Sequence, residues 1–190
     1  MNKNPASAVG RFKEINMKYE ITDIEHPTYK NLYRIRALID IGMGVKAGDL
    51  GGYVENEYNL SQYGECWLYD DSRMHDSSQM HDDAKMFNRS RMHDDSQMHD
   101  NSMMLNNAMM RDDSVMRDNS TMFDDSMMHD NSVMRDNSVM RDNSRMHDNS
   151  VMRDDSQMFD YSVMRDRAVL SGDKVLSGDA VLSGSTKCRE

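Results

Sequence analysis

Large apolar residues recur at every sixth position along most of the chain, and the residues between them are mostly polar. The series contains Leu68, a Met at each sixth position from Met74 to Met164, and then Leu170, Leu176 and Leu182. A short, strict period sustained over twenty units is typical of a solenoid, in which short strands alternate with corners. We therefore predict an all-β coil whose ladder of Met and Leu side chains points into the interior.

Each unit reads Met-x-Asp-x-Ser-x, and each place has its own residue type. The fifth place takes Ser, Ala or Cys, as at Ser72, which suits a crowded interior. The third and fourth places take Asp, Asn or Gly, as in Asp136-Asn137 and Gly178-Asp179. These residues tolerate the left-handed backbone of a sharp corner. We interpret the Asp and Asn columns as turn chemistry, in preference to a metal-binding array.

The residues that flank the inward ladder repeat with a period of 18, so residues of one kind stack on three separate walls. The apolar wall carries Trp67, Tyr69, Phe87, Met103, Leu105, Phe123, Val139 and Phe159. The histidine wall carries Arg73 with His75, Arg91 with His93, Met109 with Arg111, Met127 with His129, and Arg145 with His147. The valine wall carries Gln79 with His81, Gln97 with His99, and then Val115-Arg117, Val133-Arg135 and Val151-Arg153. Three six-residue sides per coil predict a triangular prism of about seven coils.

The pattern divides the chain into four expected regions. We expect a flexible leader at residues 1–16, an N-terminal β cap at 17–61, the repeat at 62–185 and a C-terminal tail at 186–190. The cap is predicted from strand-like segments rich in β-branched and aromatic residues, followed by a cluster of glycines. A solenoid needs such protection because each end exposes unpaired backbone groups and apolar core.

Charge narrows the classes of partner. The segment from Leu68 to Ser185 has 23 Asp against 13 Lys and Arg, which equals the net charge of −10 of the whole chain. This acidity disfavours nonspecific binding to nucleic acid or to an anionic membrane. No apolar run resembles a signal peptide or a membrane span, so we expect a cytoplasmic location. Of the two cysteines, Cys66 occupies the small interior place, which argues against a disulfide framework.

The hexads are similar to those of the hexapeptide-repeat family. Met134-Arg135-Asp136-Asn137-Ser138-Val139 stands where that family has an aliphatic residue, often Gly, then Asp or Asn, a small residue and a variable one. The lead-in Val45-Lys46-Ala47-Gly48-Asp49-Leu50-Gly51-Gly52-Tyr53-Val54-Glu55, with Asn59-Leu60-Ser61 and Cys66-Trp67-Leu68-Tyr69-Asp70, resembles the YdcK-like acyltransferases of bacteria and phages. The first place differs, since Met stands where that group has Val or Ile. The resemblance implies a left-handed parallel β-helix and a phage or prophage setting.

The resemblance also implies a chemistry, because hexapeptide acyltransferases use a His general base between neighbouring prisms of a trimer. The candidates are His93, His129, His75 and His147, and acetyl-CoA or another acyl-CoA would be the cofactor. Each His alternates with Arg at one repeating place, which favours a solvated strand residue. No unit is interrupted by a loop that could hold an acceptor, so we lean against an enzyme and expect no cofactor. We also expect no metal, because the His columns lack dedicated ligand spacing and a supporting shell.

The apolar wall is the more informative surface. Trp67, Tyr69, Phe87, Met103, Leu105, Phe123 and Phe159 form a long apolar stripe, which monomers seldom expose to water. We expect it to be an interface with another copy of the chain, as a homodimer or homotrimer, interrupted at Arg141. The alternative is that the N-terminal segment covers part of the stripe. The resulting hypothesis is a non-catalytic, self-associating acidic scaffold that also presents side chains to another protein. The alternatives are the acyltransferase and, with less support, an acidic mimic of DNA.

Overall fold

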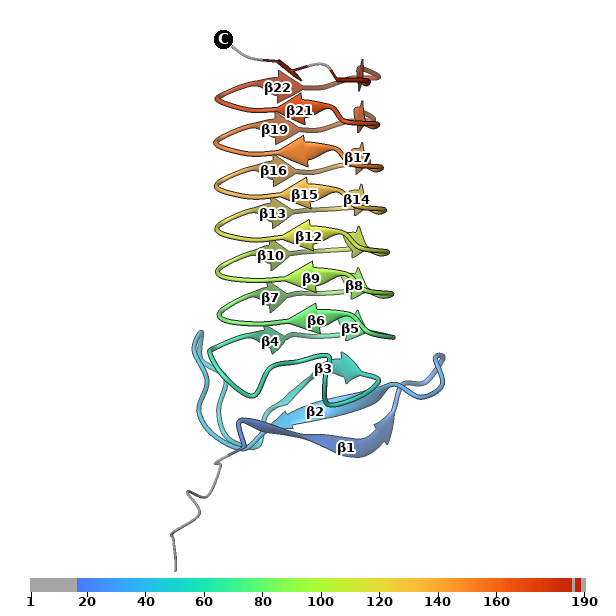
Figure 1. Cartoon of the computed structure of the whole chain (residues 1–190). Coiled ribbons are helices and arrows are strands. Elements are labelled where there is room, and N and C mark those ends of the chain that lie inside the picture. Colours follow the sequence, from blue (N-terminus) through green and yellow to red (C-terminus); the bar gives the residue numbers. More distant parts are fainter. Residues whose placement is uncertain (1–16, 186, 189–190) are drawn as a thin grey trace, which may run out of the picture.

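The computed structural model describes residues 17–185 and 187–188, and all of their regular structure is β. Figure 1 shows a stack of coils above a small N-terminal sheet, which confirms the predicted parallel β-solenoid of about seven turns. No helix in the described part of the chain is long and apolar enough to cross a membrane. The expected flexible leader at residues 1–16 lies outside the described residues.

Three parallel sheets form the walls of the coil. The apolar wall consists of β4 (Trp67–Leu68), β7 (Lys85–Met86), β10 (Met103–Met104), β13 (Thr121–Met122), β16 (Val139–Met140), β19 (Gln157–Met158) and β22 (Val175–Leu176). The histidine wall contains β5 (Arg73–Met74), β8 (Arg91–Met92), β11 (Met109–Met110), β14 (Met127–Met128), β17 (Arg145–Met146), β20 (Val163–Met164) and β23 (Val181–Leu182). The valine wall consists of β6 (Gln79–Met80), β9 (Gln97–Met98), β12 (Val115–Met116), β15 (Val133–Met134), β18 (Val151–Met152), β21 (Val169–Leu170) and β24 (Lys187–Cys188).

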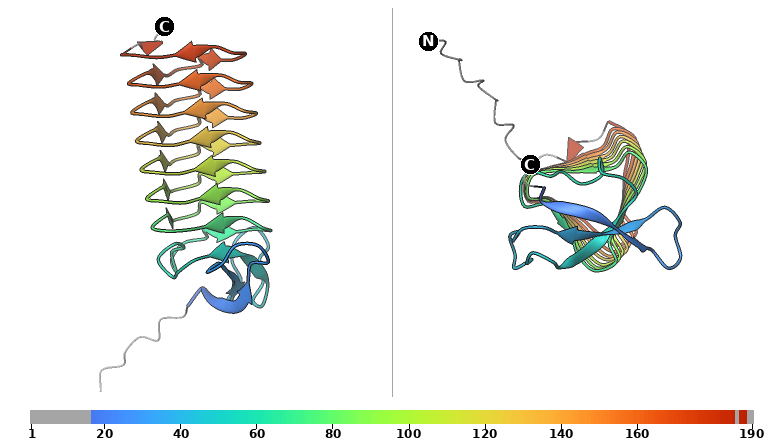
Figure 2. Two further views of the ribbon diagram at one scale, coloured as in Figure 1. Left: turned by 90° about the vertical axis from the view of Figure 1, so that its right-hand side faces the viewer. Right: turned by 90° about the horizontal axis from the view of Figure 1, so that it is seen from below.

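The register of the walls confirms the 18-residue period. Met104 pairs with Met86 on one side and with Met122 on the other, and the same offset holds along all three walls. Seen along the axis, the coils superimpose into a three-sided outline (Figure 2). Residues of one kind therefore lie directly above one another, one strand spacing apart.

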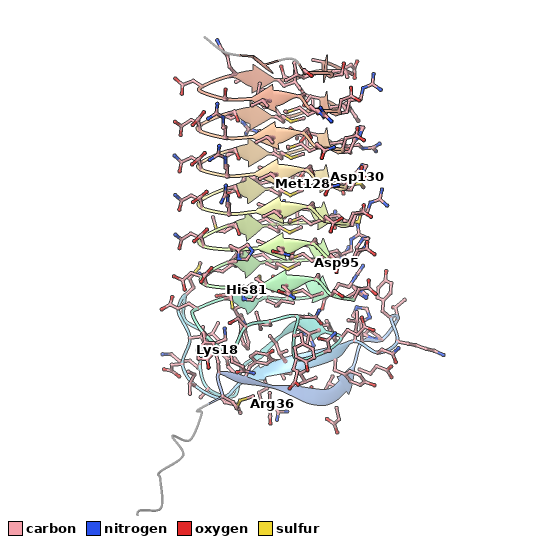
Figure 3. The ribbon with its side chains drawn as sticks, in the orientation of Figure 1. Lys18, Arg36, His81, Asp95, Met128 and Asp130 are labelled. Atoms are coloured by element: carbon pink, nitrogen blue, oxygen red, sulfur yellow. The ribbon has the colours of Figure 1, made fainter. Side chains whose placement is uncertain are left out.

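The methionine ladder fills the interior as predicted. All sixteen ladder methionines from Met74 to Met164 are fully buried, and so are the Ser and Ala residues at the fifth place from Ser72 to Ala168. Many of the fifth-place Ser hydroxyls donate to a carbonyl three residues earlier, as Ser78 does to His75 at 2.7 Å, whereas those of Ser90, Ser114, Ser126, Ser132 and Ser162 are buried without a protein partner among the described residues. Met128 and Asp130 illustrate the alternation within one coil, the first enclosed and the second at the following corner (Figure 3).

Each corner contains one left-handed residue, and it is always the residue at the third place. The φ angles range from 52° at Asp76 to 75° at Gly184 among the third-place residues from Asp70 to Gly184. Asp and Asn adopt this conformation at low cost because their short polar side chains bond locally. None of the described fourth-place residues between Asp71 and Ser185 is left-handed, although their composition is similar. A single left-handed residue is thus enough to turn the chain at each corner.

The N-terminal sheet joins the coil without a break. It consists of β1 (Tyr19–Glu25), β2 (Tyr33–Ala37) and β3 (Leu50–Val54), with antiparallel pairing of β1 to β2 and of β2 to β3. Strand β3 then pairs in parallel with β5, so the histidine wall continues into this sheet. Viewed from below, β1 and β2 cross the end of the prism (Figure 2). A side chain at Gly52 would meet the Ser72 carbonyl oxygen at 2.4 Å, so only glycine allows this close approach.

Backbone pairing with the coil extends beyond residues 62–185 at both ends. Leu60 forms a parallel bridge with Met80, and β3 pairs with the first full coil, so the coil begins inside the region expected to be a separate cap. At the other end, Lys187–Cys188 pairs with β21 and lies inside the expected tail at residues 186–190. The hexad pattern predicts neither β3 nor β24 as part of the coil. Strand β3 has the sequence of an ordinary strand, and β24 lacks the Met or Leu of the ladder.

Candidate functional site

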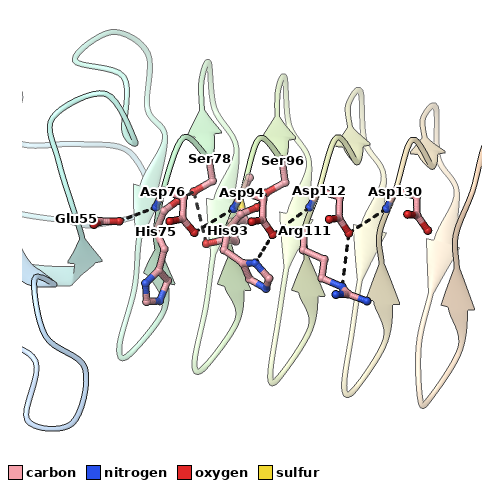
Figure 4. Close-up of polar contacts among 11 residues, drawn as sticks. Glu55, His75, Asp76, Ser78, His93, Asp94, Ser96, Arg111, Asp112 and Asp130 are labelled. Carbon is pink, nitrogen blue, oxygen red and sulfur yellow. Dashed lines mark hydrogen bonds and ion pairs between the residues drawn. The ribbon is translucent and has the colours of Figure 1, made fainter.

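The corner between the histidine wall and the valine wall carries a continuous ladder of carboxylates. The Oδ2 atom of Asp76 accepts a hydrogen bond from the backbone N–H of Asp94 at 3.3 Å, and the carboxylate of Asp94 accepts from Asp112 at 3.4 Å. Glu55 begins the ladder by accepting from the N–H of Asp76 at 2.6 Å, and Figure 4 shows the series as far as Asp130. The side chain of each corner residue therefore binds the backbone of the next coil. The same bonds at positive φ confirm the interpretation of these columns as turn chemistry.

Three histidines of the histidine wall are each paired with the corner Asp that follows them. The distance from the imidazole Nδ1 to the carboxylate is 2.6 Å for His93–Asp94, 2.7 Å for His129–Asp130 and 2.8 Å for His147–Asp148. A carboxylate beside Nδ1 selects the tautomer with the proton on that atom and leaves a lone pair on Nε2. Each pair therefore provides an oriented imidazole that can accept a proton or bind a metal ion.

The carboxylates of these pairs are held in their charged form. The backbone N–H of Asp148 is the largest cause that lowers the pKa of Asp130, and the N–H of Asp166 does the same for Asp148; the paired imidazoles add to both effects. Burial raises the pKa of Asp94, but hydrogen bonds from His93 and from the N–H of Asp112 outweigh it, so this pKa is also lowered. The backbone hydrogen bonds of the carboxylate ladder therefore also hold in place the Asp side chain that pairs with each imidazole.

The fourth candidate, His75, has different surroundings. Its ring meets that of Tyr29, in the loop between β1 and β2, edge-on with 6.2 Å between the centroids, and no bond from His75 to Asp76 is present among the described contacts. Burial and the neighbouring Arg73 lower its pKa. The four histidines expected to share one wall do share it, but only His93, His129 and His147 have an orienting carboxylate.

Two pairs of histidines stack face to face on adjacent coils. The rings of His129 and His147 lie 5.1 Å apart with 5° between their planes, and those of His81 and His99 lie 5.3 Å apart with 8°. The second pair lies on the valine wall and is hydrogen-bonded through Nε2 instead of Nδ1. Each of its Nε2 atoms lies 3.2 Å from the side-chain oxygen of a Gln two residues earlier. The two stacks thus differ in which ring nitrogen is already engaged.

The apolar wall is less open than its sequence suggests. Trp67, which we expected at an interface, is only 1% exposed, because Ile35 and Gly51 of the N-terminal sheet pack against it. Trp67 therefore offers almost no surface to a second copy of the chain, because the N-terminal sheet covers the stripe at this residue. The other six expected interface residues are Tyr69, Phe87, Met103, Leu105, Phe123 and Phe159, and all of them are half-buried.

The remaining apolar side chains shelter one another along the wall. Tyr69 and Phe87 are stacked in parallel with 4.5 Å between their centroids, and Arg141 places its guanidinium 5.0 Å from the centre of the Phe159 ring. The expected interruption at Arg141 is therefore also a cover for Phe159. In the column that follows the ladder, Tyr69, Phe87, Leu105 and Phe123 succeed one another without a charged residue, whereas in the column that precedes the ladder Lys85 stands between Trp67 and Met103.

One contact was missed by the sequence analysis because it lies outside the repeat. Lys18 is 2% exposed, and its Nζ atom donates to the Cys66 carbonyl at 3.0 Å and contacts the Cys66 sulfur at 3.1 Å. Cys66 is fully buried at the small interior place, as predicted, and burial raises the pKa of its thiol. The pair fixes the start of β1 to the first coil. By contrast, the His-Asp dipeptides at an 18-residue spacing were visible in the sequence and could have signalled the oriented pairs.

The repeat is uninterrupted, as expected. A strand starts at every sixth residue from Trp67 to Val181, so no loop projects from the described coils to hold an acceptor substrate. No known protein-family model matches the chain, and a search of the curated proteins finds no match. Membership of the YdcK-like group therefore stays a prediction.

Proposed function

We propose that the protein is a non-catalytic scaffold that associates with copies of itself through the apolar wall and presents its other two walls to a partner protein. The observation that carries this proposal is the row of Tyr69, Phe87, Leu105 and Phe123 on four consecutive coils of one wall, all half-buried within a single chain. A second copy pressed against this row would remove the remaining apolar surface from water.

The shape of the apolar wall and the charge of the corners beside it also support an interface on this wall. The strands β4, β7, β10 and β13 keep one register, so the row is straight and two such rows can meet along their length. The corners beside the wall carry Asp and Asn, which remain in water when the wall is covered. Like charges on the acidic corners disfavour other contacts between copies. A homodimer or a homotrimer would satisfy these conditions, and the trimer would agree with the left-handed hexapeptide-repeat family that the sequence resembles.

The test is the mass of the protein in solution for Phe123→Asp, measured by light scattering. We expect a lower assembly state with an unchanged far-ultraviolet circular dichroism spectrum, because the new carboxylate would have to be desolvated in the interface. Val133→Asp is the matched control, since it places the same charge on a half-buried outward position of the valine wall. An unchanged mass for Phe123→Asp, or an equal loss for Val133→Asp, would refute the interface.

A second candidate is an acyl-CoA-dependent transferase that uses a His base between subunits, and the His–Asp pairs favour it. A carboxylate that orients an imidazole is the arrangement that a general base requires. Titration with acetyl-CoA separates the two functions. Saturable binding that His93→Gln and His129→Gln each abolish would support the transferase, whereas no binding at millimolar acetyl-CoA would support the scaffold.

A further inference from the structure

The stacked pair His129 and His147 differs from every other described histidine in the combination of contacts around it. The two rings face each other on adjacent coils, and both Nδ1 atoms are bonded to corner carboxylates, Asp130 at 2.7 Å and Asp148 at 2.8 Å. The strands that carry them, β14 and β17, are paired in register, Met128 opposite Met146, so the backbone holds the rings at a fixed spacing. Such rigidity lowers the entropic cost of gathering ligands around an ion.

We propose that His129, His147 and Asp130 form a binding site for one divalent transition-metal ion of the kind that prefers imidazole, such as Zn²⁺, Cu²⁺ or Ni²⁺. One ligand atom from each of these three residues lies within 4.8 Å of the other two. Imidazole nitrogen with carboxylate oxygen is a set that these ions accept, and water completes the coordination.

The ligands need only a small movement to close around an ion. Ligand atoms in a tetrahedral zinc site lie about 3.3 Å apart, given zinc–nitrogen distances of about 2.0–2.1 Å. The side chains of His129 and His147 project from the wall and are 19% and 26% exposed, so both rings can tilt toward each other without disturbing the core. Asp148 would hold Nδ1 of His147 and so direct Nε2 of that ring to the ion, as supporting carboxylates do in metal sites.

The neighbouring positions show why the site is confined to these two coils. The column continues with Arg111 before His129 and Arg165 after His147, and their positive charges oppose a second ion further along. The other cluster of this kind, Asp76, His93 and Asp94, contains a single imidazole. The His81–His99 stack has its Nε2 atoms beside Gln79 and Gln97 and has no corner carboxylate on its rings. The site lies on a different wall from the proposed interface, so the two proposals stand separately.

The test is calorimetric titration of the full chain with Zn²⁺ in a non-chelating buffer. We expect one ion per chain, and we expect His129→Gln/His147→Gln to abolish saturable binding. The matched control is His81→Gln/His99→Gln, which removes the other stack and leaves binding unchanged. The same two columns carry Arg in other coils, at Arg111 and Arg165 and at Arg117 and Arg135, so we expect the variants to retain the fold, and the circular dichroism spectrum of each checks this.

Asp148→Asn adds a readout that separates an oriented site from loose binding to surface histidines. Loss of a supporting carboxylate typically weakens metal affinity by about 10–100-fold, so Zn²⁺ should still bind with one-site stoichiometry but more weakly. The proposal is overturned if the wild-type chain shows no saturable binding. It is also overturned if the His129/His147 double variant binds as well as the His81/His99 control, or if Asp148→Asn leaves the affinity unchanged.

Discussion

The two ends of the coil share one period but differ in how completely their ladder residues are buried. At the N-terminal end Leu60 and Leu68 are fully buried, because β1 and β2 extend the histidine wall and cross the first coil. In the last coils Leu176 is only half-buried and Leu182 is 8% exposed. No described strand lies beyond β22, β23 and β24 in the three sheets. Burial of a repeat residue is therefore set by the coils on either side of it.

The corners of the two regions differ in the same way. The first and middle coils place Asp or Asn at the left-handed position, whereas the last three units place Gly172, Gly178 and Gly184 there, at φ of 71°, 65° and 75°. These glycines donate their N–H groups to Asp154, Asp160 and Asp166 but have no carboxylate of their own. Asp supplies both the left-handed turn and an acceptor for the next coil, while Gly supplies only the turn.

The largest difference between the regions should come from placing a charge on the ladder. Met116→Asp should lower the free energy of unfolding by more than about 4 kcal/mol, because it leaves an unpaired charge in the middle of the stack. Val181→Asp, which places the same charge on an outward position of the last coil instead of on the ladder, should change it by less than about 0.5 kcal/mol, since that side chain is already half in water. Urea denaturation measures both. If Met116→Asp is as stable as the wild type, the assignment of the interior is wrong.

Acid should break the middle of the coil through the carboxylate ladder. Hydrogen bonds from backbone N–H groups lower the folded-state pKa of Asp130 and Asp148. A lowered pKa stabilises the fold above the unfolded value of about 3.9, and this stabilisation is lost as the pH falls through the folded value. Burial also lowers the pKa of His75 and His81, so a smaller loss should begin as the pH falls below about 6.5. Melting temperatures over a pH series measure both steps, and a flat profile down to about pH 3 would exclude the ladder as a source of stability.

Single corner substitutions should have the smallest effects and should separate the two roles of Asp. Asp136 has φ of 60°, and its carboxylate accepts from the Asp154 N–H at 3.2 Å. Asp136→Ala should cost about 2–4 kcal/mol, because it combines the left-handed penalty of Ala with a lost acceptor. Asp136→Gly should cost about 1 kcal/mol, because only the acceptor is lost.

The C-terminal counterpart gives the control for these corner variants. Gly178→Ala should cost about 1–2 kcal/mol, since a methyl group there meets nothing within 4 Å and only the backbone conformation is penalised. Thermal denaturation of the three variants measures the series. Equal costs for Asp136→Ala and Asp136→Gly would mean that backbone conformation plays no part at this corner.

The coil could be predicted from the sequence because each of its two periods corresponds to a structural unit, six residues to one side and 18 residues to one turn. A Met at every sixth place must recur on the inside of each wall, and like residues 18 apart must stack, so the three walls and the inward ladder follow from the pattern. The choice of Ser at the fifth place also follows, although the local hydroxyl bond of Ser78 does not. The pairing of β3 and β24 with the coil could not be predicted, because neither strand has the residue signature of the repeat.

The surface chemistry was harder to predict, because it depends on rotamers and on residues outside the repeat. The burial of Trp67 requires knowing that Ile35 and Gly51 cross that wall. The difference between the His129–His147 and His81–His99 stacks depends on which ring nitrogen meets which neighbour, and both stacks have the same His-Asp dipeptide. Equal sequence patterns thus produce unequal sites.

The exact repeat in register also makes the length of the molecule independent of its cross-section. Inserting or removing 18 residues at a corner would shift the later walls along the axis by about 4.8 Å and leave every column continuous. Inserting six would instead rotate all later walls by one side, placing the phenylalanines where the histidines now stand. Gene duplication in units of one turn could therefore lengthen the coil and keep the residues of each wall together, whereas duplication of six residues would move later residues to a different wall.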